Sequence, residues 1–372
     1  MTDARRQKRD SRPSGLVLFL VSLGAFFLAL GRVPDPNPTP AAIPPAAALE
    51  PVSESAPEPP SPAGPEAAPV EAATTAPAPA ATSVAGSTAA PEVVAEAGPE
   101  PPAPRIRDIG DLRRPRIRAA AGMLYNPRTD EVLWERRGLD QRPIASITKV
   151  MTALVLLDQE PELSRDVVVS RRDVRRASTT YLARGERVTL DALLHLALIA
   201  SDNVAARILA RASGWGTRRF VEQMNLKAAA LDLHGTSFVE PSGLDERNVS
   251  TPYDIARLIA VAGEVPALSR IMRKWTHRLR TDRRRMNIRN TNRLLRSPHA
   301  IQGGKTGYID EAGFCLTALV ELPGADPIAL VVLGAGSNAG RFSEARRLID
   351  WVSTTGRSLL EPEERVTRES AQ

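Results

Sequence analysis

The chain has 372 residues, 42% of them hydrophobic, and carries a formal net charge of +6 at pH 7. This length leaves room for one large core plus segments that do not join it. A net positive charge is compatible with a nucleic acid, an anionic membrane surface or an acidic polymer as binding partner. No zinc-ligand spacing or aromatic-interleaved basic strand accompanies it, so nucleic acid is excluded as a partner.

Residues 1–14 form a basic head, and residues 15–31 follow it without a charged side chain. Because basic residues stay on the cytoplasmic side of a membrane, we expect everything after residue 31 to be exported. As a helix, the apolar stretch would span roughly 25 Å, which a bilayer tolerates. We favour a retained transmembrane anchor. The alternative is a signal peptide cleaved near the small residues Ala29 and Gly31.

A long polar tract separates this segment from the rest of the chain. Residues 32–105 are rich in proline, alanine and glutamate, so they cannot bury enough apolar surface to fold and are predicted to be disordered. Fully extended, they could reach on the order of 200 Å, a suitable length for a tether to a distant substrate. Residues 106–357 are predicted to form one globular unit, and residues 358–372 a charged tail.

The globular unit is predicted to have strands at both ends and helices between them. Two antiparallel hairpins are expected, one at residues 118–125 and 132–135 and the other at residues 314–322 and 327–334. Helices are expected at residues 149–158, 190–200, 204–211, 217–231, 252–264 and 341–352. This order favours an α+β sandwich over a doubly wound parallel sheet.

Ser146 and Lys149 lie three residues apart at the start of an apolar helix, so their side chains share one face. Only five lysines occur among the 49 basic residues, and two of them are Lys149 and Lys305. A desolvated amine can take a proton from a serine hydroxyl, whereas a guanidinium stays protonated. Ser146 is therefore a candidate nucleophile with Lys149 as its base, although this spacing alone arises about once by chance in such a chain.

The motif Ser201-Asp202-Asn203 lies at the junction between two predicted helices. The Ser201 hydroxyl can pass a proton to a leaving amine, and the Asn203 amide can hold Lys149 and receive a substrate peptide group. All three residue types also favour helix N-caps, so capping alone is the alternative interpretation.

Residues 303–307 (GGKTG) are predicted on an edge-proximal strand just before the second hairpin. Lys305 and the Thr306 hydroxyl suit a terminal carboxylate, and the glycines let a substrate backbone approach closely. A phosphate-binding loop is the rival interpretation, but it needs a longer glycine loop before the lysine and a helix after it. Here the sequence continues as a strand.

A basic cluster precedes this strand. It comprises Arg280, Arg283, Arg284, Arg285, Arg289, Arg293 and Arg296. A solvated face is the simpler interpretation, and contact with acidic peptide stems is the alternative. The four histidines lack metal-ligand spacing and Cys315 is alone in an apolar run, so we assign no metal, cofactor or disulfide.

In the order S-x-x-K, S-x-N, K-T-G, the three motifs resemble those of the penicillin-recognising serine enzymes. Three flanking segments are similar to the D-alanyl-D-alanine carboxypeptidase and endopeptidase family: residues 238–245 (FVEPSGLD), 290–295 (NTNRLL) and 303–315 (GGKTGYIDEAGFC). The resemblance covers roughly residues 115–355. It implies a β-lactamase/transpeptidase-like fold, with a five-stranded antiparallel sheet flanked by helices and a helical subdomain.

The resemblance also implies a role for each motif residue. Ser146 would form the acyl-enzyme with Lys149 as general base, and Asn203 would orient Lys149. Ser201 would shuttle a proton to the leaving D-amino acid. Lys305 and Thr306 of the Lys305-Thr306-Gly307 motif would hold the substrate carboxylate, and the backbone N–H groups of Ser146 and Tyr308 would form the oxyanion hole.

The resemblance further implies an extracytoplasmic, periplasmic enzyme acting on peptidoglycan peptide stems, with β-lactams as covalent inhibitors. One alternative is a serine β-lactamase, but the class A pattern E-x-x-L-N fits neither residues 240–244 nor residues 246–249. Another alternative is a non-catalytic module that binds cell-wall peptide. Only 65 residues follow Gly307, which favours the compact endopeptidase-like members over carboxypeptidases with a second domain.

Overall fold

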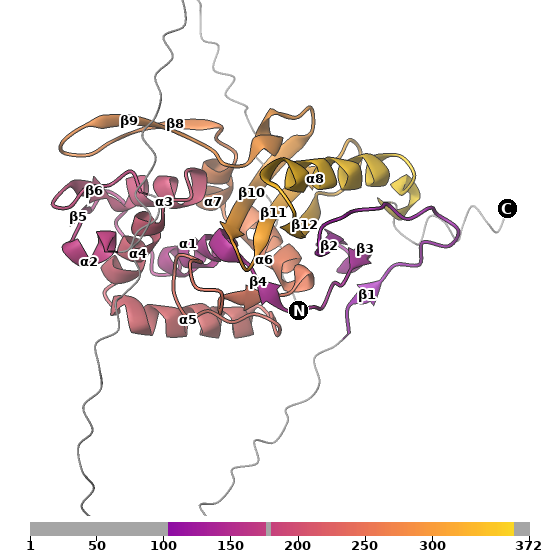
Figure 1. The fold of residues 1–372 in the computed structure, drawn as a ribbon, viewed down its shortest axis with the longest axis horizontal. Helices are drawn as coiled ribbons and strands as arrows, with labels where there is room; N and C mark the ends of the chain where they lie inside the picture. Colours follow the sequence, from indigo (N-terminus) through magenta and orange to yellow (C-terminus); the bar gives the residue numbers. More distant parts are fainter. Residues whose placement is uncertain (1–102, 176–179, 361–372) are drawn as a thin grey trace, which may run out of the picture. The chain divides into compact units, whose positions relative to one another are not determined.

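The computed structural model describes residues 103–175 and 180–360, which belong to one compact unit (Figure 1). The predicted head, the apolar segment 15–31 and almost all of the linker lie outside these residues, as does most of the predicted tail. Within the two described ranges, no helix combines the length and the apolar character needed to cross a bilayer. The proposed boundaries at residues 106 and 357 remain predictions.

The central sheet has the strand order β1-β3-β2-β12-β11-β10. Its strands are β1 (Arg105–Ile106), β2 (Ala121–Asn126), β3 (Glu131–Arg136), β10 (Ala300–Ile309), β11 (Gly313–Glu321) and β12 (Ile328–Ala335). The five strands from β3 to β10 are antiparallel, as predicted, and both predicted hairpins are present. The two-residue β1 adds a sixth strand, parallel to β3, and next to it Arg107 forms a buried ion pair with Glu131 at 3.0 Å.

Both faces of this sheet are covered, which explains why its last two strands read as continuous apolar runs. Alternate residues such as Leu330 and Val332 pack with α8 (Asn338–Ser353), whereas Val331 and Leu333 belong to the core shared with α6 (Pro252–Glu264). In Figure 1 these two helices flank β11 and β12. The α+β prediction is therefore confirmed.

Apart from α6, the chain between the two groups of sheet strands forms further helices. They are α1 (Thr148–Leu157), α2 (Arg171–Val174), α3 (Leu190–Ile199), α4 (Asn203–Ala212), α5 (Gly216–Ala230) and α7 (Pro266–Met272). Helix α1 contacts α3, α4, α5 and α6, and its residues 148–156 are all buried. A helix that is buried on all sides needs such surroundings. The predicted helices agree with the observed bounds to within about three residues.

Several short elements were not predicted. They are helices α2 and α7 and the paired strands β4 (Arg142–Pro143) with β7 (Val249–Ser250), β5 (Asp166–Val168) with β6 (Arg187–Thr189), and β8 (Thr276–Arg280) with β9 (Arg285–Arg289). Three single-turn 3₁₀ helices were also missed, namely η1 (Ala145–Ile147), η2 (Arg293–Arg296) and η3 (Arg357–Leu360). The β8–β9 turn contains Asp282 and Arg283 and no glycine, so it lacks the usual hairpin signal.

Candidate active site

The fold brings the three predicted motifs together at one cleft of about 610 Å³. Ser146 comes from η1, Ser201 and Asn203 from the start of α4, and Thr306, Gly307 and Tyr308 from the edge strand β10. The two motif lysines lie behind this surface, because Lys149 is 0% exposed and Lys305 is 1% exposed. All eight predicted site residues therefore belong to one site.

Lys149 lies at the centre of a short hydrogen-bonded network. Its Nζ is 2.7 Å from Ser146 Oγ, 2.7 Å from Asn203 Oδ1 and 2.5 Å from the Ser242 carbonyl oxygen. The amide and carbonyl oxygens can only accept hydrogen bonds. A neutral amine has two N–H donors and one lone pair, so it donates to these two oxygens and turns its lone pair to the Ser146 hydroxyl. The geometry suits proton transfer from Ser146 to Lys149.

The surroundings of Lys149 make the neutral form accessible. Burial lowers the pKa of this amine from 10.5 to about 7, and the positive charge of Arg207 adds to the lowering. The negative charges of Glu240 and Asp202 act in the opposite direction and raise the pKa. An amine with a pKa near 7 is partly unprotonated at neutral pH and can still accept a proton, which is what a general base requires.

The Ser201-Asp202-Asn203 motif both caps a helix and contributes side chains to the cleft. Asp202 is the N-cap of α4, and its carboxylate accepts hydrogen bonds from Ala205 N at 2.9 Å and Tyr181 N at 2.6 Å. Ser201 adopts a left-handed backbone conformation with φ of 60°, which turns the chain between α3 and α4. The capping interpretation therefore holds for Asp202, while Ser201 and Asn203 face the cleft.

Lys305 links the strand β10 to Ser201. Its Nζ donates to Ser201 Oγ at 2.7 Å and to its neighbour's carbonyl oxygen, Thr306 O, at 2.8 Å. Burial lowers the pKa of Lys305 well below its ordinary value, and the charges of Lys149 and Arg341 lower it further. The Thr306 hydroxyl donates to Thr291 Oγ1 at 2.6 Å, so the side chains of Thr306 and Thr291 hold each other at the cleft.

Gly307 allows β10 to lie directly against the segment that carries the nucleophile. A Cβ atom at this position would lie 2.8 Å from Ile144 O and 3.1 Å from Ser146 N. Such contacts are too close for any larger residue without movement of the backbone. The glycine thus lets the backbone of β10 approach the backbone at Ser146, and Ser146 and Tyr308 line the same cleft.

The sequence did not reveal what the loop at residues 240–244 does. The Glu240 carboxylate accepts hydrogen bonds from the backbone N–H groups of Ser242, Gly243 and Leu244, and Ser242 Oγ donates to it at 2.6 Å. Gly243 has a φ of 80°, and a Cβ there would overlap the Ala145 carbonyl. The loop is therefore folded around Glu240 and directs the Ser242 carbonyl to Lys149.

Arg341 is a second site residue that the sequence did not indicate. It lines the cleft from α8, and its Nη1 donates to Gly307 O at 2.9 Å and Cys315 O at 3.2 Å. Its contact with β10 spans 34 residues of sequence. No local pattern marks such a contact in advance.

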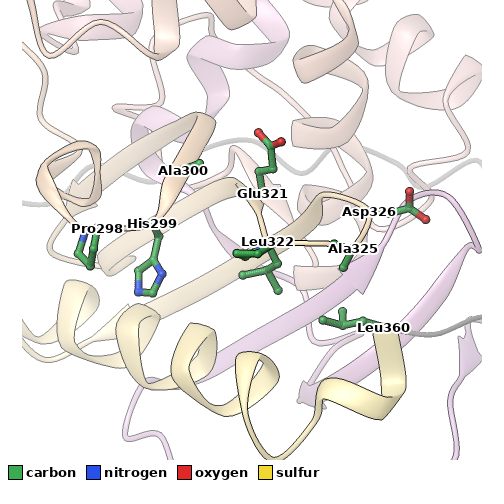
Figure 2. A pocket seen from close by; sticks show the side chains of 10 residues that line it. Pro298, His299, Ala300, Glu321, Leu322, Ala325, Asp326 and Leu360 are labelled. Atoms are coloured by element: carbon green, nitrogen blue, oxygen red, sulfur yellow. The ribbon is translucent and has the colours of Figure 1, made fainter.

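A hollow of similar size lies at the opposite end of β10 and β11. Figure 2 shows this hollow, which has a volume of about 620 Å³ and is lined by residues such as His299, Glu321 and Leu360. It contains none of the motif residues. The motif residues lie at the other end of β10.

Comparison with known proteins gives a consistent result. The sequence model of the family described as D-alanyl-D-alanine carboxypeptidase (Peptidase_S11) matches residues 111–337. The D-alanyl-D-alanine endopeptidase of Pseudomonas aeruginosa is 35% identical over 247 residues, covering 64% of this chain and 78% of that protein. The D-alanyl-D-alanine endopeptidase of Escherichia coli is 32% identical, covering 65% and 79%. The solved Streptomyces K15 DD-transpeptidase has a TM-score of 0.61 at 29% identity, covering 64% of this chain and 98% of that one.

Proposed function

Because this chain belongs to the D-alanyl-D-alanine carboxypeptidase family of serine peptidases, we propose that Ser146 attacks the carbonyl between two D-amino acids of a peptidoglycan peptide and becomes acylated. The observation that carries this proposal is the 2.7 Å contact between Lys149 Nζ and Ser146 Oγ, with the other two amine contacts made to oxygens that only accept. The enzyme is a serine DD-peptidase that acts on peptidoglycan.

The first step transfers the Ser146 hydroxyl proton to Lys149 as the serine oxygen attacks the carbonyl carbon. The N–H groups of Ser146 and Tyr308 stabilise the oxyanion that develops. Ser201 then gives its proton to the leaving amine and is reprotonated at the expense of the proton held by Lys149, which returns Lys149 to the neutral form; Lys305 Nζ lies 2.7 Å from the Ser201 oxygen. Water hydrolyses the acyl-enzyme, with Lys149 again acting as base.

Substrate binding is assigned to the strand that faces the nucleophile. The ammonium group of Lys305 and the hydroxyl of Thr306 provide a charge and a donor for the carboxylate of the substrate. Gly307 lets the substrate backbone approach β10. β-Lactams, which carry a carboxylate beside a reactive carbonyl, occupy the same position and acylate Ser146.

Within the family we favour an endopeptidase, which cuts cross-links between peptidoglycan strands. Two relatives at 35% and 32% identity are named D-alanyl-D-alanine endopeptidase. The β-lactamase alternative requires a carboxylate base that activates water, and Glu240 instead bonds the backbone of its own loop.

We also propose that the enzyme works outside the cytoplasm and that residues 15–31 anchor it in the membrane. Extraction of membranes with carbonate would release the chain if the segment were cleaved.

One parallel assay tests the function. Purified chain is incubated with cross-linked muropeptides, with a pentapeptide ending in D-Ala-D-Ala and with the lactamase substrate nitrocefin. Cleavage of the muropeptide cross-link with little turnover of nitrocefin is the expected result. Fluorescent penicillin should label the wild-type chain and leave Ser146→Ala unlabelled. An intact mass without a penicillin adduct would contradict the acyl-enzyme.

A further inference from the structure

The ribbon formed by β8 and β9 has two chemically different faces. Residues opposite each other in the register share a face, so His277, Leu279, Met286 and Ile288 lie on one side. Leu279 and Ile288 are buried in the core, and the His277 ring stacks on His195 of α3 with 3.8 Å between ring centroids. Figure 1 shows the ribbon extending from the sheet alongside α3. This face anchors the ribbon to the fold.

The other face carries only exposed polar residues, four of which are arginines. We call Arg278, Arg280, Arg285 and Arg289 the arginine stripe. Arg280 lies directly opposite Arg285, a pairing of like charges that is unfavourable unless an anion lies between them. Within residues 103–175 and 180–360, no carboxylate forms an ion pair with any arginine of the stripe.

Other arginines nearby do have partners, which makes the stripe distinctive. Arg284 bonds the buried Glu186 carboxylate at 3.1 Å, and Arg283 donates to the Gly185 carbonyl at 2.9 Å. These two residues of the predicted basic cluster therefore hold the tip of the ribbon in place. The stripe is left to face solvent with a charge of four and a length of about 14 Å, at roughly 3.4 Å per residue.

The stripe is continuous with the active-site cleft through other cationic residues. Strand β9 ends at Arg289, and Thr291, two residues later, lines the cleft. The guanidinium groups of Arg289 and Arg296 both lie over the Trp275 ring, at 5.9 and 5.5 Å from its centroid. Burial lowers the pKa of the cleft residue Arg341 to about 10, and the nearby charge of Arg293 adds to this lowering. Cationic groups thus extend from the cleft wall to the end of the ribbon.

From this arrangement we propose that the arginine stripe binds the acidic peptide stems of polymeric peptidoglycan, outside the bond that is cleaved. The inference rests on the proposed function, because it concerns a remote part of the same substrate. Guanidinium groups pair with carboxylates in a two-pronged geometry. Since the stripe spans about 14 Å, it suits a substrate with several carboxylates along an extended chain and offers little to a short peptide.

The test compares two double variants of the full chain that lose the same charge. Arg280→Gln with Arg285→Gln alters the stripe, and Arg218→Gln with Arg219→Gln alters an exposed part of α5. Binding to isolated peptidoglycan sacculi is measured by co-sedimentation at low and high salt. The stripe variant should bind about 3- to 10-fold more weakly at low salt, the control should change less than about 2-fold, and high salt should remove the difference.

Two further measurements separate this inference from the proposed function. Both variants should be acylated by fluorescent penicillin, and should cleave a short peptide ending in D-Ala-D-Ala, at the wild-type rate. Equal binding of sacculi by the stripe and control variants would overturn the proposal. Failure of the wild-type chain to cleave any D-Ala-D-Ala peptide would instead count against the proposed function, and the binding comparison would still decide the role of the stripe.

Discussion

We expect the rate at which penicillin acylates Ser146 to rise with pH and to level off above pH 7. The reason is that burial lowers the pKa of Lys149 to about 7, and only the neutral amine can accept the serine proton. Below this pKa the neutral fraction falls about tenfold for each pH unit, so acylation at pH 5 should be roughly 50- to 100-fold slower than at pH 8. The second-order acylation rate, measured with fluorescent penicillin from pH 5 to 10, checks this profile.

An ordinary lysine would give a different curve. With a pKa near 10.5, the rate would keep rising about tenfold per unit between pH 8 and pH 10, and that result would refute the reasoning. Lys149→Arg provides a second check, because a guanidinium stays charged throughout this range and acylation should fall by roughly 10²- to 10⁴-fold. Lys227→Arg is the matched control, since Lys227 lies on α5 and pairs with Asp158 at 3.0 Å.

Three more substitutions give separate tests. Glu240→Gln removes a charge that raises the Lys149 pKa, so the rising limb of the acylation profile should move to lower pH; an unchanged limb would contradict this. Gly307→Ala places a Cβ 2.8 Å from Ile144 O and should slow penicillin acylation at least about tenfold; a wild-type rate would argue against the close approach. Asp202→Ala removes the α4 cap and should lower the free energy of unfolding in urea by about 1 kcal/mol.

Much of the fold followed from local signals in the sequence. The apolar runs of β11 and β12 and the turn between β2 and β3 predicted both hairpins correctly, because each signal involves neighbouring residues. The ribbon β8–β9 was missed although its apolar residues alternate with polar ones, since each strand has only five residues and the turn lacks glycine. The parallel strand β1 was missed because it has only two residues and its neighbouring contact, Arg107 with Glu131, joins residues that are 24 apart in the sequence.

The site was predictable where its chemistry is carried by short motifs. Ser146 with Lys149, Ser201 with Asn203, and residues 305–307 were identified from short motifs, and Tyr308 from the family resemblance; the fold places them at one cleft or directly behind it. The residues that support them were not identified. The Ser242 carbonyl reaches Lys149 across 93 residues, and it contributes through its backbone, so its side chain carries no signal.

Arginine makes up most of the basic residues of this chain, and two of its five lysines are the buried amines of the cleft. Lys149 and Lys305 are both fully buried, and burial lowers the pKa of each. The charge on Lys149 lowers the pKa of Lys305 further, so protonation of one amine disfavours protonation of the other.

This coupling has a consequence for the order of proton transfer. When Lys149 takes the serine proton, release of a proton from Lys305 towards Ser201 becomes more favourable, and Ser201 is the group assigned to protonate the leaving amine. A bound substrate carboxylate would act in the opposite direction on Lys305 and hold its proton until the leaving group departs. Neither response is open to a guanidinium, which stays charged at every working pH. We therefore expect that replacing either buried lysine by arginine slows acylation.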